Sequence, residues 1–185
     1  DGIPSVSFDN YEAARLAMRH LIELGHRRIA LICGRTAVND RARDRRRAYE
    51  DAMNELGAEV EAAWIHEADF DHAEGRQAMR KLLSLAPRPT AVFCANDIQA
   101  MGALYECQEQ GIVVPEEMSL VGFDDVPAAQ YTRPQLTTVR VPADAMGEIA
   151  ATRLLDAIAN GTKPISQVLS VELVRRETTN AAPEN

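Results

Sequence analysis

Two pairs of polar residues, Asn96-Asp97 and Asp124-Asp125, each follow a short run with strand character, without a linker. The run at residues 91–95 is unbroken apolar sequence, as in a strand buried on both faces of a parallel sheet. In such a sheet, ligands bind beyond the carboxyl ends of the strands. Amide and carboxylate groups can hydrogen-bond to hydroxyls and ring edges. The two pairs therefore predict a recognition site for a polar small molecule.

A helix expected over residues 40–56 adds another candidate, Arg45. The apolar stripe of this helix consists of Tyr49, Ala52, Met53 and Leu56. At about 100° per residue, Arg45 falls roughly 40° from Tyr49, inside the stripe, whereas most neighbouring arginines belong to a solvated face. A buried guanidinium needs an anionic partner or several acceptors. Because Arg45 lies near the start of the helix, it can reach the same sheet edge as Asn96 and Asp124.

An aromatic residue, Phe70, follows the short strand expected at residues 64–68. Two interpretations stay open for it: a hydrophobic plug over the sheet, or a flat platform for a ligand ring. Residues of metal-binding types surround it: His66, Glu67, Asp69, Asp71, His72 and Glu74. Their spacing matches no metal motif, and alternate residues on a strand face opposite ways. Solvated loop charge is the favoured interpretation, and no metal site is expected.

Catalysis finds little support in the sequence. There is no GxSxG, GxGxxG, P-loop or HExxH motif, and no Ser or Cys has a His at an interpretable spacing. We therefore expect neither an enzyme nor a cofactor. Cys33, Cys94 and Cys107 lack CxxC spacing and lie in or beside apolar segments. They are expected to be small core residues in a reducing, cytoplasmic compartment.

The composition is that of a soluble globular chain with a core. Of the 185 residues, 46% are hydrophobic and 26% are charged. The formal net charge of -8 argues against DNA binding by this chain itself, because phosphate binding depends on a surplus of Lys and Arg. The sequence contains no signal peptide, membrane-spanning run or internal repeat. Since the chain begins at Asp1 without a Met, it is interpreted as a fragment.

Strands and helices are expected to alternate along the chain and so to position these candidates. Strands are expected at residues 3–8, 28–33, 64–68, 91–95, 119–125, 136–141 and 167–175. Helices are expected to begin near Asp9, Asp40, Asp71, Asp97 and Pro142. A helical turn is expected at residues 126–131 and a frayed tail at residues 178–185. The alternation predicts an α/β fold with a parallel sheet in a three-layer sandwich.

Five motifs stand in order along the chain: HLIELGHRRIA at residues 20–30, FCAND at 93–97, VGFDD at 121–125, LTTV at 136–139 and VELVRRETT at 171–179. Together they resemble the effector-binding core of the lactose and purine repressor family (LacI/GalR). The resemblance implies a transcription regulator with a periplasmic binding protein type I-like fold, in which two lobes enclose a ligand cleft. It also implies a helix-turn-helix headpiece outside this chain, through which operator DNA would be bound.

The resemblance divides the chain mainly into one lobe. Residues 1–8 would end the N-terminal lobe, and residues 9–137 would form the C-terminal, effector-binding lobe. Residues 138–165 would return to the N-terminal lobe, residues 166–180 would supply the final strand of the C-terminal lobe, and residues 181–185 would be a tail. The helix at residues 142–160 would then have to bury its apolar stripe on a partner chain or against this lobe.

The resemblance also assigns roles to the candidates. Arg45 matches the family arginine that binds the effector, Phe70 the aromatic that stacks on it, and Asn96 and Asp124 the polar groups that hold it. The loop at residues 34–45 is one residue longer than usual, and Arg41 stands where a small polar residue is common. Asn96 favours a sugar-like effector, because an amide both donates to and accepts from hydroxyls. A periplasmic sugar-binding component of a transporter is the alternative from another class, since it shares the fold and the cleft.

A homodimer is implied as well, with no role for a membrane. The resemblance places its contact on the helix from Asp97, the start of the helix from Asp71 and the turn at residues 128–133. The expected interface residues are Met101, Leu104, Tyr105, Gln108 and Tyr131.

Overall fold

The computed structural model describes residues 3–58 and 60–183. The strands are β1 (Val6–Phe8), β2 (Ile29–Cys33), β3 (Ile65–Glu67), β4 (Ala91–Cys94), β5 (Ser119–Asp124), β6 (Thr137–Arg140), β7 (Gln167–Leu169) and β8 (Glu172–Val174). The helices are α1 (Asn10–Glu23), α2 (Asp40–Glu55), α3 (His72–Leu83), α4 (Asp97–Glu109) and α5 (Ala143–Asn160). Two short 3-10 helices, η1 (Ala62–Trp64) and η2 (Pro127–Tyr131), precede β3 and follow β5.

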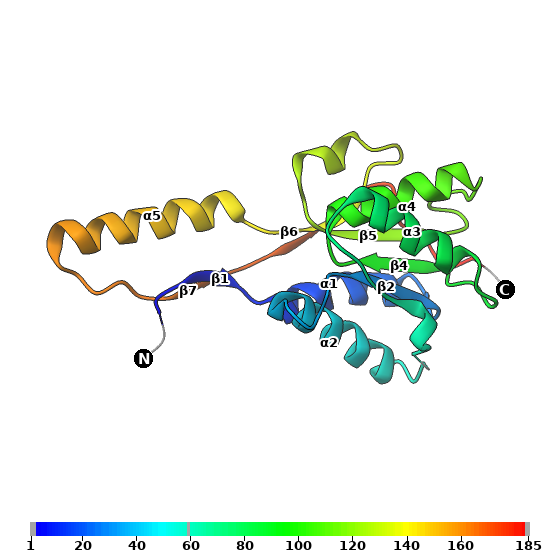
Figure 1. Ribbon diagram of the computed structural model, residues 1–185, viewed down its shortest axis with the longest axis horizontal. Helices are drawn as coiled ribbons and strands as arrows, with labels where there is room; N and C mark the ends of the chain where they lie inside the picture. The colour runs from blue at the N-terminus through cyan, green and yellow to red at the C-terminus, as the bar shows by residue number, and fades with distance from the viewer. Residues whose placement is uncertain (1–2, 59, 184–185) are drawn as a thin grey trace.

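Six strands form the main sheet in the order β3-β2-β4-β5-β6-β8. The first five are parallel to their neighbours, and β8 is antiparallel to β6. Helices α1 and α2 cover one face of the sheet, and α3 and α4 cover the other (Figure 1). This three-layer arrangement confirms the predicted α/β fold class.

The two faces of the sheet bury separate apolar clusters. In β2, Ile29, Leu31 and Cys33 pack with α1 and α2, whereas Ala30 and Ile32 pack with α3 and α4. A strand buried on both faces has no solvent side, which explains why its sequence shows no polar alternation. All three cysteines are unpaired and buried, which confirms their interpretation as core residues. Burial raises the pKa of Cys33 and of Cys107 to about 12.

Side-chain caps fix where two of the helices begin. The Asp9 carboxylate accepts a hydrogen bond from the Glu12 backbone N–H at 3.0 Å, and the Asp71 carboxylate accepts one from the Glu74 N–H at 2.8 Å. These contacts confirm the helix starts predicted near Asp9 and Asp71, and each pairs an Asp cap with a Glu three residues later. Among residues 3–58 and 60–183, every helix is too short or too polar to cross a lipid bilayer.

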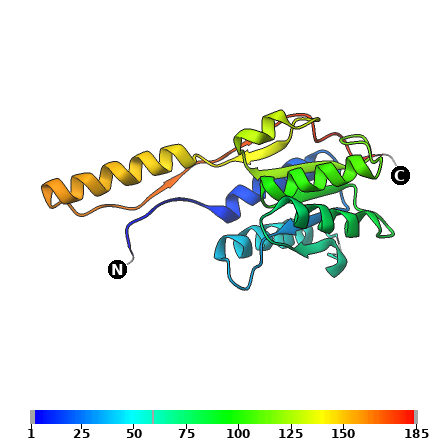
Figure 2. The same cartoon turned by 45° about the horizontal axis from the view of Figure 1, so that its top comes forward.

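An arm made of β1, β7 and α5 projects from the main body (Figures 1 and 2). Strand β1 pairs with β7 in a parallel two-stranded sheet of its own. The single strand expected at residues 167–175 is therefore wrong. The chain leaves the two-stranded sheet after Leu169 and enters the main sheet, so that β7 pairs with β1 and β8 pairs with β6. The main sheet also extends to Arg140, past the expected division at residue 137, since β6 pairs with β5 over its whole length.

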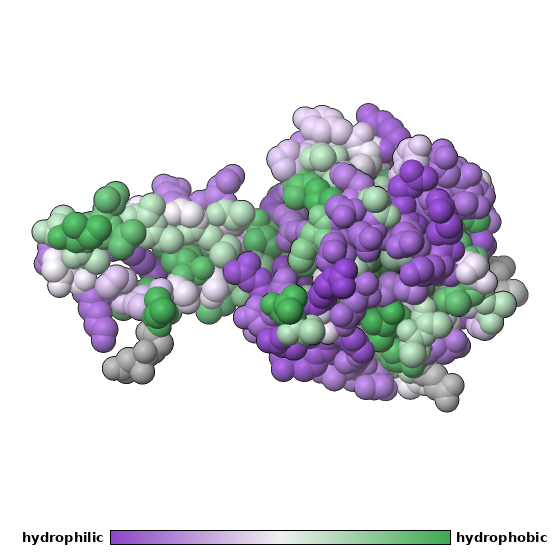
Figure 3. Space-filling view, in the orientation of Figure 1, coloured by the Kyte–Doolittle hydropathy of each residue, from purple (hydrophilic) through white to green (hydrophobic). Residues whose placement is uncertain are grey.

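Helix α5 lies on the arm, away from the main body, and all of its residues are described and none is buried. Leu154, Leu155 and Ile158 are 59%, 65% and 73% exposed. Apolar surface accordingly runs along the arm (Figure 3). Of the two expected alternatives, packing of this stripe against the same lobe is wrong, because β6 and β7 carry the helix out of its reach. Burial on a partner chain stays a prediction.

The segment after β8 is docked on the main sheet. The Leu120 N–H donates to the Thr178 carbonyl at 2.7 Å, and the Ala182 N–H donates to the Leu24 carbonyl at 2.8 Å. Thr178 is fully buried. The predicted frayed tail is therefore wrong for residues 178–182, because backbone groups of Thr178, Asn180, Ala181 and Ala182 are hydrogen-bonded. Residues 184–185 lie outside the described part of the chain.

Candidate functional site

One cavity, at the carboxyl ends of the central strands, brings together all four residues predicted to bind a ligand. Arg45, Phe70, Asn96 and Asp124 line it. The remaining lining residues are Gly34, Asn39, Arg41, Ala42 and Ala95. The strand-end position matches the rule for ligand sites in parallel sheets.

Arg45 is buried and held in position by the fold. Its Nε donates to Asn10 Oδ1 at 2.9 Å, and its Nη1 donates to the Ala95 carbonyl at 2.6 Å. Its Cζ lies 3.7 Å from the centre of the Phe123 ring. Burial lowers the pKa of Arg45 to about 10, and the Asp124 carboxylate opposes this shift. The guanidinium therefore remains charged at neutral pH and has Nη2 left to direct at a ligand.

Asp124 faces Arg45 without forming a close ion pair. The distance from Arg45 Nη2 to Asp124 Oδ1 is 3.9 Å, which is too long for a hydrogen bond. Asn96 Nδ2 donates to Asp124 Oδ2 at 2.7 Å. Burial raises the pKa of Asp124, while Arg45 and the Asn96 bond lower it. A ligand hydroxyl placed between Arg45 and Asp124 could accept from the first and donate to the second.

The Asn96 side chain is already occupied at both ends. Its Oδ1 accepts from the Ile98 N–H at 2.9 Å and so caps α4, while its amino group donates to Asp124. The argument for a sugar-like ligand assumed an amide free to donate and accept. In this arrangement Asn96 orients Asp124 and retains one N–H for a ligand.

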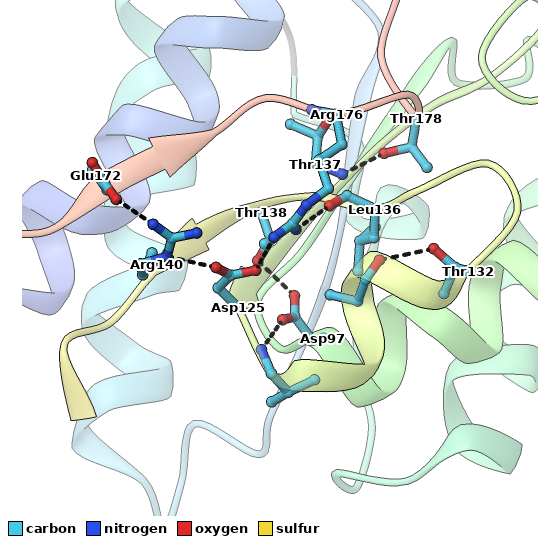
Figure 4. Close-up of polar contacts among 12 residues, drawn as sticks. Asp97, Asp125, Thr132, Leu136, Thr137, Thr138, Arg140, Glu172, Arg176 and Thr178 are labelled. Atoms are coloured by element: carbon cyan, nitrogen blue, oxygen red, sulfur yellow. Dashed lines mark hydrogen bonds and ion pairs between the residues drawn. The ribbon is translucent and has the colours of Figure 1, made fainter. Parts of the chain in front are cut away.

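The turn that carries Asp124 is fixed through its neighbour Asp125, which lies between Arg140 and Arg176 (Figure 4). Asp124 and Asp125 have φ angles of 113° and 55°, in the region that L-residues rarely adopt. The Asp125 carboxylate accepts from Arg140 and from Arg176, both at 2.6 Å. These two ion pairs join the end of β5 to β6 and to the segment after β8. They stabilise a strained turn, and thereby the direction of Asp124.

Asp97, the acidic residue of the predicted Asn96-Asp97 pair, points into the protein rather than into the cavity. It is fully buried and accepts from Thr138 Oγ1 at 2.6 Å and from the Val126 N–H at 2.9 Å. A Cβ at Gly122 would lie 2.2 Å from Asp97 Oδ1, so the glycine provides the space for this carboxylate. Burial raises the pKa of Asp97 to about 7, against the effect of its two hydrogen bonds. Asp97 is thus a structural residue behind the cavity.

Phe70 lies over Gly34 at the rim of the cavity. A Cβ at residue 34 would come within 2.3 Å of Phe70 Cζ, so only glycine allows the ring this position. The Phe70 residue remains 48% exposed. A plug over the sheet would be buried, so the exposed ring fits the interpretation as a ligand platform better.

Three polar residues near the site were not predicted as ligand contacts. Asn39 caps α2 through the Ala42 N–H at 3.0 Å, and Arg41 lies in the first turn of that helix. Asn10 holds Arg45 from α1. The start of α2 after a loop could have indicated Asn39 as a cap. Sequence gives no signal for Asn10, because its partner is 35 residues away.

The acidic residues near Phe70 are engaged by arginines rather than gathered around a common point. Asp69 binds Arg35 at 2.6 Å, and Glu67 binds Arg46 at 2.9 Å. Within the described part of the chain, no three residues of metal-binding type are clustered closely enough to hold an ion.

The residues expected at a dimer contact do not all reach the surface. Tyr105 and Tyr131 are 47% and 74% exposed, and Gln108 is exposed and donates to the Arg133 carbonyl. Met101 is half-buried. Leu104 is only 2% exposed and packs in the cluster beneath α3 and α4, so its expected place at an interface is wrong.

The fold and the strand-end cavity define a periplasmic binding protein-like domain, and this family matches residues 18–179. The HTH-type transcriptional repressor PurR of Escherichia coli O1:K1 is 41% identical over 174 residues, which are 94% of this chain and 51% of the repressor. A LacI family regulator from Mycobacterium smegmatis is 34% identical with a TM-score of 0.87, covering 97% of this chain and 67% of that structure. The regulator CelR, solved as a cellobiose complex, is 36% identical with a TM-score of 0.87, and the match covers 95% of this chain and 54% of that structure.

The chain therefore belongs to the LacI family of transcriptional regulators, as part of the effector-binding core, which confirms the predicted family. It spans about half the length of the curated relatives that it matches. These relatives are regulators and not enzymes.

Proposed function

We propose that this chain is the ligand-sensing part of a LacI-type transcriptional regulator and that its cavity binds a small, polar, sugar-like effector. The observation that carries the proposal is the convergence of Arg45, Phe70, Asn96 and Asp124 in one strand-end cavity. The cellobiose complex of CelR supports a sugar-like ligand.

Each cavity residue has a distinct proposed role. Arg45 donates from Nη2 to a ligand oxygen, and Asp124 accepts from a ligand hydroxyl. Phe70 packs against an apolar ring face, while Asn96 fixes Asp124 in the direction of the ligand. Arg45 and Asp124 are both held before the ligand binds, which limits the entropy lost on binding.

The cavity forms one wall of the proposed cleft, and the arm connects it to the other lobe. Its volume of about 190 Å³ is below the roughly 300–1,000 Å³ of complete ligand pockets. We assign the arm to the N-terminal lobe and the main sheet to the C-terminal lobe. A ligand held by one lobe alone would bind weakly, because contacts from the second lobe are lost.

Effector binding would be transmitted through the strands that lead to the arm. Asp124 is adjacent to Asp125, whose carboxylate binds Arg140 at the end of β6 and Arg176 after β8. Both strands connect directly with the arm (Figure 1). A shift in Asp124 on ligand binding would alter the angle between the lobes and so modulate DNA binding by a helix-turn-helix headpiece.

The regulator is further proposed to be a cytoplasmic homodimer without catalytic activity. The exposed residues Tyr105, Gln108 and Tyr131 and the half-buried Met101 form its proposed contact, with Leu104 supporting them from the core. The periplasmic transport component finds no support among the relatives, which are named as regulators.

Isothermal titration of the chain with a panel of mono- and disaccharides tests the proposed function. Loss of a charge-assisted hydrogen bond costs about 1.5–3 kcal/mol, so Arg45→Ala and Asp124→Ala should each weaken binding by at least about tenfold. Glu116→Ala removes an exposed carboxylate at the opposite end of β5 and should leave the affinity unchanged. If Asp124→Ala binds as tightly as the parent chain, the assigned site is wrong.

A further inference from the structure

The cavity contains a second arginine, Arg41, whose guanidinium has no hydrogen bond or ion pair within the described part of the chain. The Arg41 backbone N–H donates a hydrogen bond to Asp40 Oδ1. Other arginines of α2 are engaged. Arg43 donates to the Thr36 carbonyl at 2.8 Å, Arg46 binds Glu50 at 2.7 Å, and Arg47 lies 3.3 Å from Asp44. Arg41 differs from them because its side chain lines the cavity.

The charges that line the cavity do not balance. The charged residues that line it are two arginines, Arg41 and Arg45, and one carboxylate, Asp124, and the other lining residues are uncharged. The charge of Arg41 disfavours the charged form of Arg45 and favours the ionised form of Asp124, so it acts on both groups. The cavity therefore carries one positive charge in excess.

Two helix termini add to this positive potential. Asn39 caps α2 and Asn96 caps α4, and both residues line the cavity. The amino-terminal end of a helix carries a partial positive charge and favours anions. Asp124 offsets part of this potential, and Asn96 already donates to its carboxylate.

We propose that the effector carries an anionic group, a phosphate or a carboxylate. This group binds Arg41, while Arg45 and Asp124 hold the hydroxyls of the effector. This inference rests on the proposed function and specifies its ligand class as an acidic sugar derivative. A guanidinium presents a planar fork of donors that matches both anions. Arg41 is exposed, so water solvates its charge in the free protein. An anionic group would form an ion pair with Arg41 that a neutral sugar cannot form.

Paired ligands test the proposal directly. Calorimetric titration would compare neutral aldoses and disaccharides, each with its phosphate ester and its uronic or aldonic acid, at low and high salt. At least one acidic member should bind about tenfold or more tightly than its neutral parent, and added salt should reduce this preference. The phosphate and carboxylate series distinguish the two anions.

Two variants of α2 test whether Arg41 causes the preference for the acidic ligand. Arg41→Ser should remove the preference, so that the acidic ligand and its neutral parent bind this variant with similar affinities. Arg47→Ser changes an exposed arginine outside the cavity and should retain the preference. Circular dichroism of both variants would establish that they fold.

The possible failures are distinguishable. Neutral sugars that bind as tightly as their acidic derivatives, or a preference that persists in Arg41→Ser, would overturn this inference alone. If no member of either series binds, both the proposed function and this inference fail.

Discussion

Arg45 and Asp124 occupy their positions because residues from two other segments of the chain hold them. Asn10 and Ala95 accept from Arg45, and Asn96 donates to Asp124. Helical periodicity was enough to predict that Arg45 is buried, since burial depends on the angle around one helix. The partners could not be predicted in the same way, because each lies 28–50 residues away.

Asp97 leads to a prediction about pH. Its pKa is raised from 3.8 to about 7 by burial, so the folded state binds more protons than the unfolded state between about pH 4 and pH 7. Stability therefore falls as the pH rises through this window. Asp97→Asn removes the titrating group and can still accept from the Val126 N–H.

Urea unfolding at several pH values checks this prediction. The stability of the parent chain relative to Asp97→Asn should decrease from pH 4 to pH 7 and then level off, by up to about 1.4 kcal/mol for each unit of pKa difference. A constant difference across this range would show that Asp97 does not titrate as described.

At the scale of elements, alternation along the sequence predicted most strands and helices correctly. Buried strands such as β2 and β4 have apolar runs, and α1 and α3 have caps at the expected spacing. The division into β7 and β8 could not be read from the sequence, because residues 167–175 look like one strand and only their partners differ. The docked segment after β8 was missed for the same reason, since its hydrogen bonds reach distant residues.

Contact between α3 and α4 depends on two glycines, and this gives a prediction about stability. A Cβ at Gly102 would lie 2.2 Å from the His72 carbonyl oxygen, and one at Gly75 would lie 2.3 Å from the Gln99 carbonyl oxygen. Gly102→Ala should therefore force the helices apart and destabilise the fold by about 1–3 kcal/mol or more.

The matched control is Gly147→Ala in α5, where a Cβ would meet nothing within 4 Å. Alanine has the higher helix propensity, so this variant should be unchanged or more stable by up to about 1 kcal/mol. Urea unfolding of both variants measures the two changes in the free energy of unfolding. Equal stability of Gly102→Ala and the parent chain would show that the two helices are not in such close contact.

At the scale of the whole molecule, the main body and the arm differ in how far their apolar surfaces are covered. The main sheet is covered on both faces, whereas α5 exposes Leu154, Leu155 and Ile158 on an arm whose apolar surface is open (Figure 3). The family resemblance predicted that residues 138–165 leave the lobe; residues 138–140 remain in the main sheet, and α5 lies on the arm. The position of the arm follows from pairing between β1 and β7, which are about 160 residues apart and carry no local signal of each other.

The central claim is that the cavity beyond β4 and β5 binds the effector. An NMR titration of the ¹⁵N-labelled chain, with a ligand from the sugar series at millimolar concentration, tests it most directly. The backbone amides of Gly34, Asn39, Ala42, Asn96 and Asp124 should shift together in the parent chain, and these shifts should be lost in Asp124→Ala. Shifts confined to other parts of the protein, or unchanged shifts in Asp124→Ala, would contradict the claim.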